Sequence, residues 1–195
     1  ITEYSPKKIK IITNHYEHKD IQLIDVELAG PKMMVEDLTR VIMTDAKSVY
    51  DTLGPGFPEV MYHKAMEVEL RTKCIPYETE VITPINYKNF NVGHTRADVI
   101  VNKSYVLEFK ALSYFNTDTG ILQLKNYMKS HGISCGMIIN FGQPNKANDG
   151  TLNFRMISYV PEQQNYVVWD WNGTEFVNQA QTKNNNNEKG VMNIK

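Results

Sequence analysis

The sequence predicts an α/β (α+β) domain in which a mixed central sheet is flanked by helices, with extra β elements at both ends. Three observations lead to this prediction. The 195 residues, 42% of them hydrophobic, suffice for one ordinary core. Two segments with helical periodicity are followed by three strand-like segments, a third helix and a nearly continuous apolar strand. Further strand-like segments precede and follow this series.

We divide the chain into four parts on these patterns. An N-terminal β extension covers residues 1–30, the core covers 31–160, a C-terminal β-hairpin covers 161–180 and a polar tail covers 181–195. The tail is of low complexity and buries too little apolar surface to fold alone.

The N-terminal extension reads as a hairpin of two strands, Ile9–Thr13 and Ile21–Leu28, around a polar loop. His15 and His18 lie in that loop. An HxxH pair without further ligand spacing is typical of a solvated surface rather than of a metal site.

A first amphipathic helix is expected between Pro31 and Gly54, because apolar residues recur there at steps of three and four. These residues are Met34, Leu38, Val41, Ile42, Val49 and Leu53. A second helix begins after Pro58, which suits a first helical turn, and runs to about Arg71.

Glu59 opens the second helix and shares a face with Tyr62 and His63. A carboxylate in this first turn has an ordinary explanation in the helix dipole. Helix periodicity alone therefore leaves open whether Glu59 belongs to a functional site.

Three strands, a helix and a fourth strand are expected next, over residues 79–87, 95–101, 105–111, 121–130 and 135–142. A further strand over 152–160 precedes a hairpin, for which Asn172-Gly173 predicts a two-residue type I′ turn. The run CGMIINFG predicts a strand that is buried on both faces.

Chemistry concentrates on the second and third of these strands. Side chains alternate along a strand, so Glu108 and Lys110 point the same way, and Asp98 on the preceding strand can lie beside them. Two carboxylates and an amine form a hard-cation site with a base, the set that phosphodiester hydrolysis requires. A structural salt bridge is the alternative reading of an ExK sequence taken alone.

Composition restricts the partners and the compartment. The formal net charge of −1 gives no global sign of nucleic-acid binding, so binding would rest on local patches or on a bound metal. Cys74 and Cys135 lack CxxC spacing and predict free thiols in a reducing compartment. No apolar run approaches ~18 residues, so no membrane span is expected and an intracellular location, cytoplasm or nucleus, is favoured.

Residues from about Leu38 to Gly142 resemble the GxxExxY family within the PD-(D/E)xK nuclease superfamily. The resemblance rests on GFPEVMY (56–62) with the preceding LGPGF loop, the R-x-D of Arg96 and Asp98, the ExK of Glu108 and Lys110, and the strand INFG. The QxxxY of Gln123 and Tyr127 is similar to the motif of RecB-type nucleases and of phage lambda exonuclease. The fold implied is a restriction-endonuclease-like core.

The resemblance implies a set of metal ligands. Asp98 and Glu108 would hold Mg²⁺ or Mn²⁺, together with the backbone carbonyl of Phe109. Glu59 would add a carboxylate from its helix, and His63, one turn later, is a candidate extra ligand.

It also implies roles for the remaining site residues. Lys110 would position the attacking water, Gln123 would hold Lys110 or a metal-bound water, and Tyr127 would contact the substrate phosphate or complete that network.

The main functional hypothesis is a metal-dependent nuclease that hydrolyses phosphodiester bonds of DNA, with RNA not excluded. The QxxxY motif favours processing of DNA ends, as an exonuclease does, over site-specific cutting. The first alternative is a catalytically idle nuclease-fold module that binds DNA or a protein partner through the terminal extensions. The second is a structural protein whose tail docks into a larger assembly. A homo-oligomer through the extensions stays open.

Overall fold

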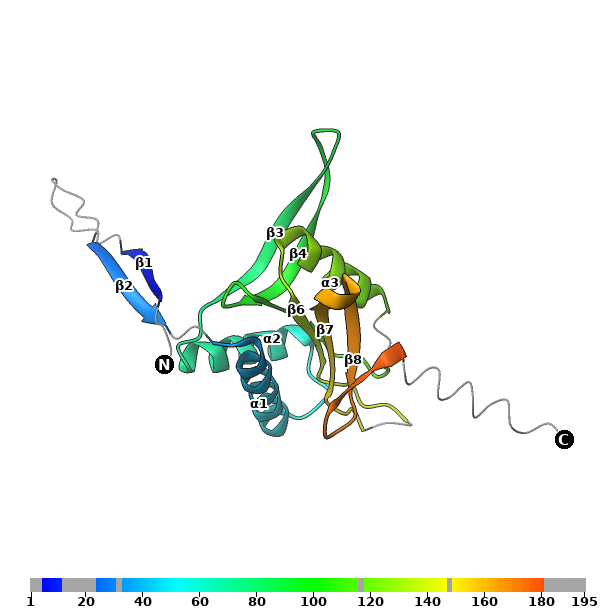
Figure 1. Ribbon diagram of the computed structural model, residues 1–195. Coiled ribbons are helices and arrows are strands. Elements are labelled where there is room, and N and C mark those ends of the chain that lie inside the picture. The colour runs from blue at the N-terminus through cyan, green and yellow to red at the C-terminus, as the bar shows by residue number, and fades with distance from the viewer. Residues whose placement is uncertain (1–4, 12–23, 31–32, 116–117, 147–148, 181–195) are drawn as a thin grey trace.

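The computed structural model describes residues 5–11, 24–30, 33–115, 118–146 and 149–180. Its central feature is a mixed seven-stranded sheet with helices on both faces (Figure 1). The strand order is β3-β4-β5-β6-β7-β8-β9, which is also the order along the chain. Neighbouring strands are antiparallel except for β5 and β6, which are parallel. The predicted α/β architecture with a mixed central sheet is confirmed.

The helices are α1 (Val35–Leu53), α2 (Glu59–Thr72) and α3 (Asp118–His131), with a short 3₁₀ turn at Pro161–Gln163. The strands of the main sheet are β3 (Tyr77–Tyr87), β4 (Phe90–Val101), β5 (Tyr105–Lys110), β6 (Cys135–Asn140), β7 (Asn153–Val160), β8 (Asn165–Trp171) and β9 (Phe176–Asn178). None of the described helices is long and apolar enough to cross a membrane.

The N-terminal extension forms its own antiparallel pair of strands, β1 (Ser5–Ile11) and β2 (Ile24–Gly30). The predicted hairpin is therefore confirmed in outline, with strand bounds shifted by a few residues. His15 and His18 in the connecting loop, and the tail from residue 181, lie outside the described residues.

Helices α1 and α2 cover one face of the sheet. The apolar stripe of α1 and three buried residues of α2, Tyr62, Met66 and Leu70, pack against inward-facing residues of the central strands. Those strand residues are Val99, Val101, Tyr105, Leu107, Phe109, Met137 and Ile139, all buried. Removing this much apolar surface from water is the main favourable contribution to folding.

Helix α3 covers the opposite face with Ile121, Leu124, Tyr127 and Met128, which pack against Ile100, Val106, Ile138 and Ile157. Strand β6 lies between the two layers, and all six of its residues are buried. This confirms the prediction that CGMIINFG forms a strand buried on both faces.

The connection β5–α3–β6 fixes where a site can form. Because β5 and β6 are parallel, their carboxyl ends meet at one edge of the sheet, where Lys110 pairs with Asn140. The loops after both strands and the α1–α2 loop all end at this edge: Gln143 Nε2 donates to the carbonyl of Phe57, 2.7 Å away. Ligands bind at such edges in open α/β sheets.

The C-terminal hairpin extends the main sheet through β8 and β9. Its turn differs from the prediction, because Trp171 pairs with Phe176 and the loop therefore spans four residues rather than two. The Asn172 side chain accepts hydrogen bonds from the backbone N–H groups of Thr174 and Glu175, both at 2.9 Å. This side-chain turn stabilises the longer loop, so the predicted type I′ turn is wrong.

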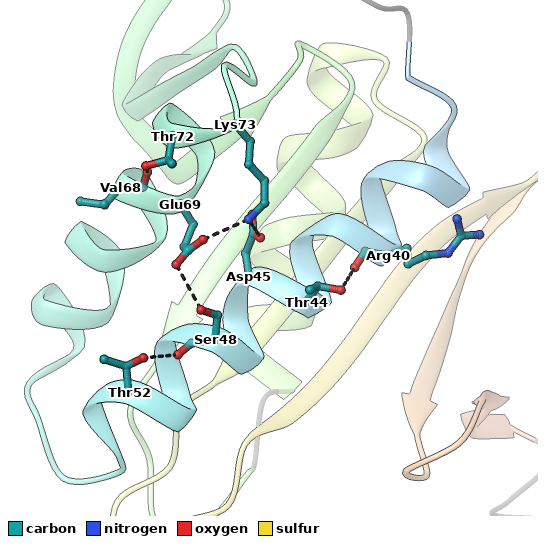
Figure 2. A network of polar contacts seen from close by, with 9 residues as sticks. All are labelled: Arg40, Thr44, Asp45, Ser48, Thr52, Val68, Glu69, Thr72 and Lys73. Carbon is teal, nitrogen blue, oxygen red and sulfur yellow. Dashed lines mark hydrogen bonds and ion pairs between the residues drawn. The ribbon is translucent and has the colours of Figure 1, made fainter.

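A polar clamp joins α1 to α2 (Figure 2). The fully buried carboxylate of Asp45 forms an ion pair with Lys73, whose ammonium also contacts Glu69 at 3.0 Å. Ser48 donates to the other oxygen of Glu69 at 3.2 Å. Burial raises the pKa of Asp45 despite the opposing effect of Lys73. The cation therefore compensates a charge that the helix interface would otherwise exclude.

Removing the cation should cost more stability than removing the carboxylate charge. Lys73→Met leaves a buried, uncompensated carboxylate and should lower the free energy of unfolding at pH 7 by about 3 kcal/mol. Asp45→Asn leaves Lys73 with Glu69 and should cost about 1 kcal/mol. Urea unfolding at pH 7 and at pH 5 measures both.

The penalty of Lys73→Met should shrink on acidification. A raised folded-state pKa means that protonating Asp45 favours the folded state, so the destabilisation is smallest below that pKa and grows as pH rises through it. Equal costs for the two variants, or a penalty independent of pH, would contradict this account of the clamp.

Candidate active site

The site begins where β4 and β5 separate. Their ladder contains three pairs, from Val101↔Tyr105 to Val99↔Leu107, and stops there. At the next position the carboxylate of Asp98 replaces the backbone as acceptor: Phe109 N–H donates to Asp98 Oδ2 at 2.9 Å. This side-chain bond satisfies the freed N–H and holds Asp98, which is 8% exposed, in place. We call the point where β4 and β5 separate, beside Asp98 and Glu108, the fork.

The neighbouring strand β3 is distorted at the same level. Glu80 lies opposite Asp98, between the pairs Thr79↔Val99 and Val81↔Ala97, and adopts a left-handed φ of 49°. A non-glycine residue in that region within a strand is uncommon and carries backbone strain. Val99 packs with the α1–α2 core while Ala97 packs with α3, although a regular strand would point both to one face. The sheet therefore turns at Asp98.

Glu108 and Lys110 lie together on β5. Lys110 Nζ donates to Glu108 Oε1 at 2.6 Å, and the two side chains are 24% and 16% exposed respectively. The same-face arrangement expected from strand alternation is thus observed. Phe109, between them, points into the α1–α2 core.

Negative charge accumulates at this fork. Burial raises the pKa of Glu108, and the negative charge of Asp98 adds to the effect, while Lys110 opposes it. Burial works to lower the pKa of Lys110, but the carboxylates of Glu108, Glu59 and Asp98 outweigh burial, and its pKa is raised. Three carboxylates therefore act on one ammonium group.

Glu59 joins this group from the first residue of α2. The residue is exposed, yet partial loss of hydration raises the pKa of its carboxyl, with Asp98 acting in the same direction and Lys110 in the opposite one. Arg96, which lies 3.6 Å from Glu80, also acts on Glu59. The structure thus brings Asp98, Glu108, Lys110 and Glu59 into one electrostatic cluster.

The backbone carbonyl of Phe109 points to the same edge. In a strand, the N–H and C=O of one residue point to the same side, and the following residue points to the other. Phe109 N–H is directed to Asp98 on β4, whereas the carbonyl of Lys110 accepts from Phe141 N–H beyond β6 at 2.9 Å. The Phe109 carbonyl therefore faces the open fork.

Asn140 fixes the chain immediately beyond Lys110. Its side chain is 1% exposed, accepts from Leu112 N–H at 2.8 Å and donates to the Leu112 carbonyl at 3.0 Å. Asn140 is not among the site residues predicted from the sequence. The signal was present, because Asn140 is the one polar side chain of a strand that is otherwise apolar or glycine.

The tyrosine of GFPEVMY has a structural role here. Tyr62 is fully buried and stacks on Phe141, with ring centroids 4.4 Å apart. Its hydroxyl donates to the carbonyl of Gly54 at 2.8 Å and accepts from Phe57 N–H at 3.1 Å. Tyr62 therefore braces the loop that precedes Glu59 and holds the start of α2 at the site.

The loop after β6 is closed by an unusually close backbone contact. Gly142 has a φ of 73°, and a Cβ built on it would lie 2.6 Å from the carbonyl carbon of Gly150. Tyr50 of α1 donates to the carbonyl of Gly150 at 2.5 Å. The glycine of INFG thus has a steric reason, because only glycine fits between these segments.

The two residues of the QxxxY motif both lie on α3. Gln123 is exposed on α3, and among the described residues no hydrogen bond joins it or Tyr127 to Glu108 or Lys110. Tyr127 is buried, stacks on His131 at 4.2 Å between centroids, and directs its hydroxyl toward Thr83. Burial raises the pKa of that hydroxyl. The catalytic roles of both residues remain predictions.

His63 lies on the other side of β5 from Glu108. Its ring contacts Phe109, with centroids 5.2 Å apart, and its Nε2 lies 3.5 Å from Glu67 Oε1, one turn further along α2. This geometry does not favour His63 as a ligand of the same ion as Glu108.

As placed, no three His, Cys, Asp or Glu side chains of the described residues form a ready metal-binding group. In the site, Lys110 contacts one oxygen of Glu108, and Phe109 N–H donates to one oxygen of Asp98. The donors themselves fit Mg²⁺ or Mn²⁺: all are oxygens, and a divalent cation would neutralise the charge that raises the pKa of Glu108.

Comparison with known proteins identifies the family. The family model of the PD-(D/E)XK nuclease superfamily matches residues 36–151, which span α1 to the loop after β6. The chain belongs to the PD-(D/E)XK nuclease superfamily. The mixed sheet with its three helices is the α/β, restriction-endonuclease-like fold of that superfamily.

Among solved structures, the chain is similar to one titled "Crystal structure of SSO0001". The similarity is 26% identity over 41% of this chain and 42% of that chain, with a TM-score of 0.31. No curated protein sequence matches the chain significantly. The matching family model is one of nucleases, and the activity of this chain is therefore a matter for proposal.

Neutralising Glu108 should stabilise the fold. A raised folded-state pKa means that the ionised carboxylate costs stability once pH exceeds that pKa, so Glu108→Gln should raise the free energy of unfolding at pH 7. The gain should be about 0.5–2 kcal/mol, the usual range for relieving a strained functional site. Thermal unfolding at pH 7 and at pH 4 tests this, with exposed Glu162→Gln as the matched control.

The stabilisation should disappear at the lower pH, where Glu108 is protonated in both states of the wild type. A destabilised Glu108→Gln variant at pH 7 would instead assign the residue to a structural salt bridge with Lys110.

Proposed function

We propose that the protein is a metal-dependent deoxyribonuclease that hydrolyses phosphodiester bonds and processes DNA ends. The observation that carries the proposal is the Glu108–Lys110 pair beside Asp98, at the point where β4 and β5 separate. A salt bridge that served stability alone would not need a second carboxylate, Asp98, at 8% exposure, nor strain at Glu80.

Asp98 and Glu108 would hold Mg²⁺ or Mn²⁺, with the Phe109 carbonyl as a backbone ligand and Glu59 as a further carboxylate. When bound, such an ion polarises the phosphate and lowers the pKa of coordinated water. Asp98 reaches this role while one of its oxygens is held by Phe109 N–H, so its orientation is fixed before an ion arrives.

Lys110 would orient the attacking water and offset charge on the phosphate. Its ammonium is held by Glu108 at 2.6 Å and is acted on by Asp98 and Glu59, so it lies among the proposed metal ligands, which supports this role. Asn140 supports this position through Leu112, two residues beyond Lys110.

Processing of ends, rather than internal cutting, is supported by the resemblance of Gln123 and Tyr127 to the QxxxY motif. Both residues lie on α3, which begins after the loop that follows Lys110. DNA is proposed as the substrate on the same ground, and RNA is an explicit arm of the test.

Nuclease activity is tested with Mg²⁺ and Mn²⁺ on end-labelled linear duplex, single-stranded DNA, closed circular DNA and RNA. Lys110→Ala should reduce the rate by at least about 100-fold, the usual contribution of a positioned proton-transfer or charge-stabilising group. Lys129→Ala, an exposed lysine on α3, is the matched control and should retain the wild-type rate.

Cleavage of linear but not circular DNA, lost in Lys110→Ala, is the expected result. Cleavage of circles would make the protein an endonuclease, and preference for RNA would overturn the substrate. The absence of cleavage of every substrate would favour a catalytically idle nuclease-fold module.

Asp98→Asn should weaken metal binding without unfolding the protein. The amide oxygen can still accept from Phe109 N–H, so the fork is retained, while the ligand loses its negative charge. Titration calorimetry with Mn²⁺ should show affinity falling by about 10-fold or more, with circular dichroism unchanged. Unaltered Mn²⁺ affinity would exclude Asp98 as a ligand.

A further inference from the structure

The β3–β4 hairpin continues well beyond the helix-covered part of the sheet, and Figure 1 shows it projecting from the domain. Strand β4 pairs with β5 only over Val99–Val101, whereas it pairs with β3 out to Tyr87↔Phe90. Over the described residues, the outer part of the hairpin, from Val81 to Thr95, is therefore paired with no third strand. We call this part the ribbon.

The ribbon exposes large apolar side chains. Phe90 is 75% exposed, the highest value among the large hydrophobic residues described, and its cross-strand neighbour Tyr87 is 63% exposed. The others on the ribbon are Ile82, Ile85 and Val92. An isolated ribbon gains nothing from exposing such residues, so they indicate a contact surface.

The charge on the ribbon has one sign. From Val81 to Thr95 there is no Asp or Glu, although the whole chain carries 22 acidic and 21 basic residues. The ribbon does carry Lys88 and His94, and Lys88 Nζ lies 5.4 Å from the centre of the Tyr87 ring. A surface of aromatic rings and cations without carboxylates is complementary to phosphates and bases.

The ribbon leads directly into the active site. Strand β4 carries Phe90 at its outer end and Asp98 eight residues later, a separation of roughly 25 Å at the rise of a β-strand. That corresponds to about seven stacked nucleotides. Arg96 lies between them, forms an ion pair with Glu80 at 3.6 Å and acts on Glu59 of the site.

We propose that the tip of the β3–β4 hairpin binds nucleic acid, with Tyr87 and Phe90 stacking on unpaired bases and Lys88 contacting the phosphate backbone. This inference rests on the proposed nuclease function and adds a substrate feature to it: a single-stranded segment about seven nucleotides from the scissile bond. In this proposal the hairpin positions the nucleic-acid strand, and the site residues at the fork cleave it.

A second copy of the chain is the competing occupant. Its ribbon would need a continuous dry apolar face, but Asn86, Asn89, Asn91 and Lys88 interrupt the rings at the tip. Side-chain amides and a cation suit bases and phosphates, which are polar at their edges, better than a packed protein interface.

The test measures binding of fluorescent single-stranded DNA of about 20 nucleotides by anisotropy, in the Lys110→Ala background with Mg²⁺. Tyr87→Ala with Phe90→Ala should weaken binding roughly 10- to 100-fold, because stacking is lost. Tyr87→Phe with Phe90→Tyr keeps both rings and should bind like the parent. Lys88→Ala should reduce the salt slope by about 0.7.

Substrate length adds a second readout. An oligonucleotide of about three nucleotides cannot span the distance from fork to tip, so the parent should bind it much more weakly than the strand of about 20 nucleotides. Equal binding of the long strand by the parent and the double alanine variant, or no binding by the parent, would overturn the inference. A change from dimer to monomer in the double alanine variant, measured by light scattering and with its affinity for DNA unchanged, would also overturn the inference.

The failure of the hairpin and of the proposed function can be told apart. If the wild type cuts DNA, and the double alanine substitution impairs neither cutting in the wild-type background nor binding in the Lys110→Ala background, the hairpin inference fails alone. If binding depends on the rings while the wild type cuts nothing, the nuclease proposal fails and the binding element stands.

Discussion

The hydrogen bond from Phe109 N–H to the Asp98 carboxylate determines the geometry of the site. It ends the β4–β5 ladder without leaving a buried N–H unsatisfied, so two central strands can separate inside a packed sheet. Without it, the fork would cost the desolvation of a backbone donor. The same bond orients Asp98 toward Glu108 and turns the Phe109 carbonyl to the open edge. One hydrogen bond thus allows the strands to separate and fixes the position of two candidate metal ligands, the Asp98 carboxylate and the Phe109 carbonyl.

The rest of the domain supports a fork that is itself strained. Carboxylates crowd one another there, and Glu80 holds an unfavourable backbone conformation. Two apolar cores, one on each face of the sheet, contribute the folding free energy that offsets this destabilisation. Tyr62 and Asn140 transmit that rigidity locally, since each uses its side chain to fix backbone next to a site residue.

Strand β4 belongs both to the exposed ribbon and to the candidate active site. Strand β4 joins an exposed aromatic tip to Asp98 through continuous backbone, so contact at one end can set the register at the other. A β-ribbon is suited to this, because its cross-strand hydrogen bonds keep it extended even where no third strand covers it. The near-neutral net charge is compatible with such local binding, since the acidic residues lie elsewhere in the chain.

The sequence by itself determined the order of helices and strands, the two-sided burial of β6, and the grouping of Glu108 with Lys110. These follow from local periodicity, which residues encode without reference to distant partners. Tertiary structure alone decided that Asp98 ends a ladder, that Tyr62 braces a loop, that Tyr127 stacks on His131, and that the β8–β9 loop spans four residues. The first two depend on which long-range neighbour satisfies a polar group, and spacing along one chain does not specify that.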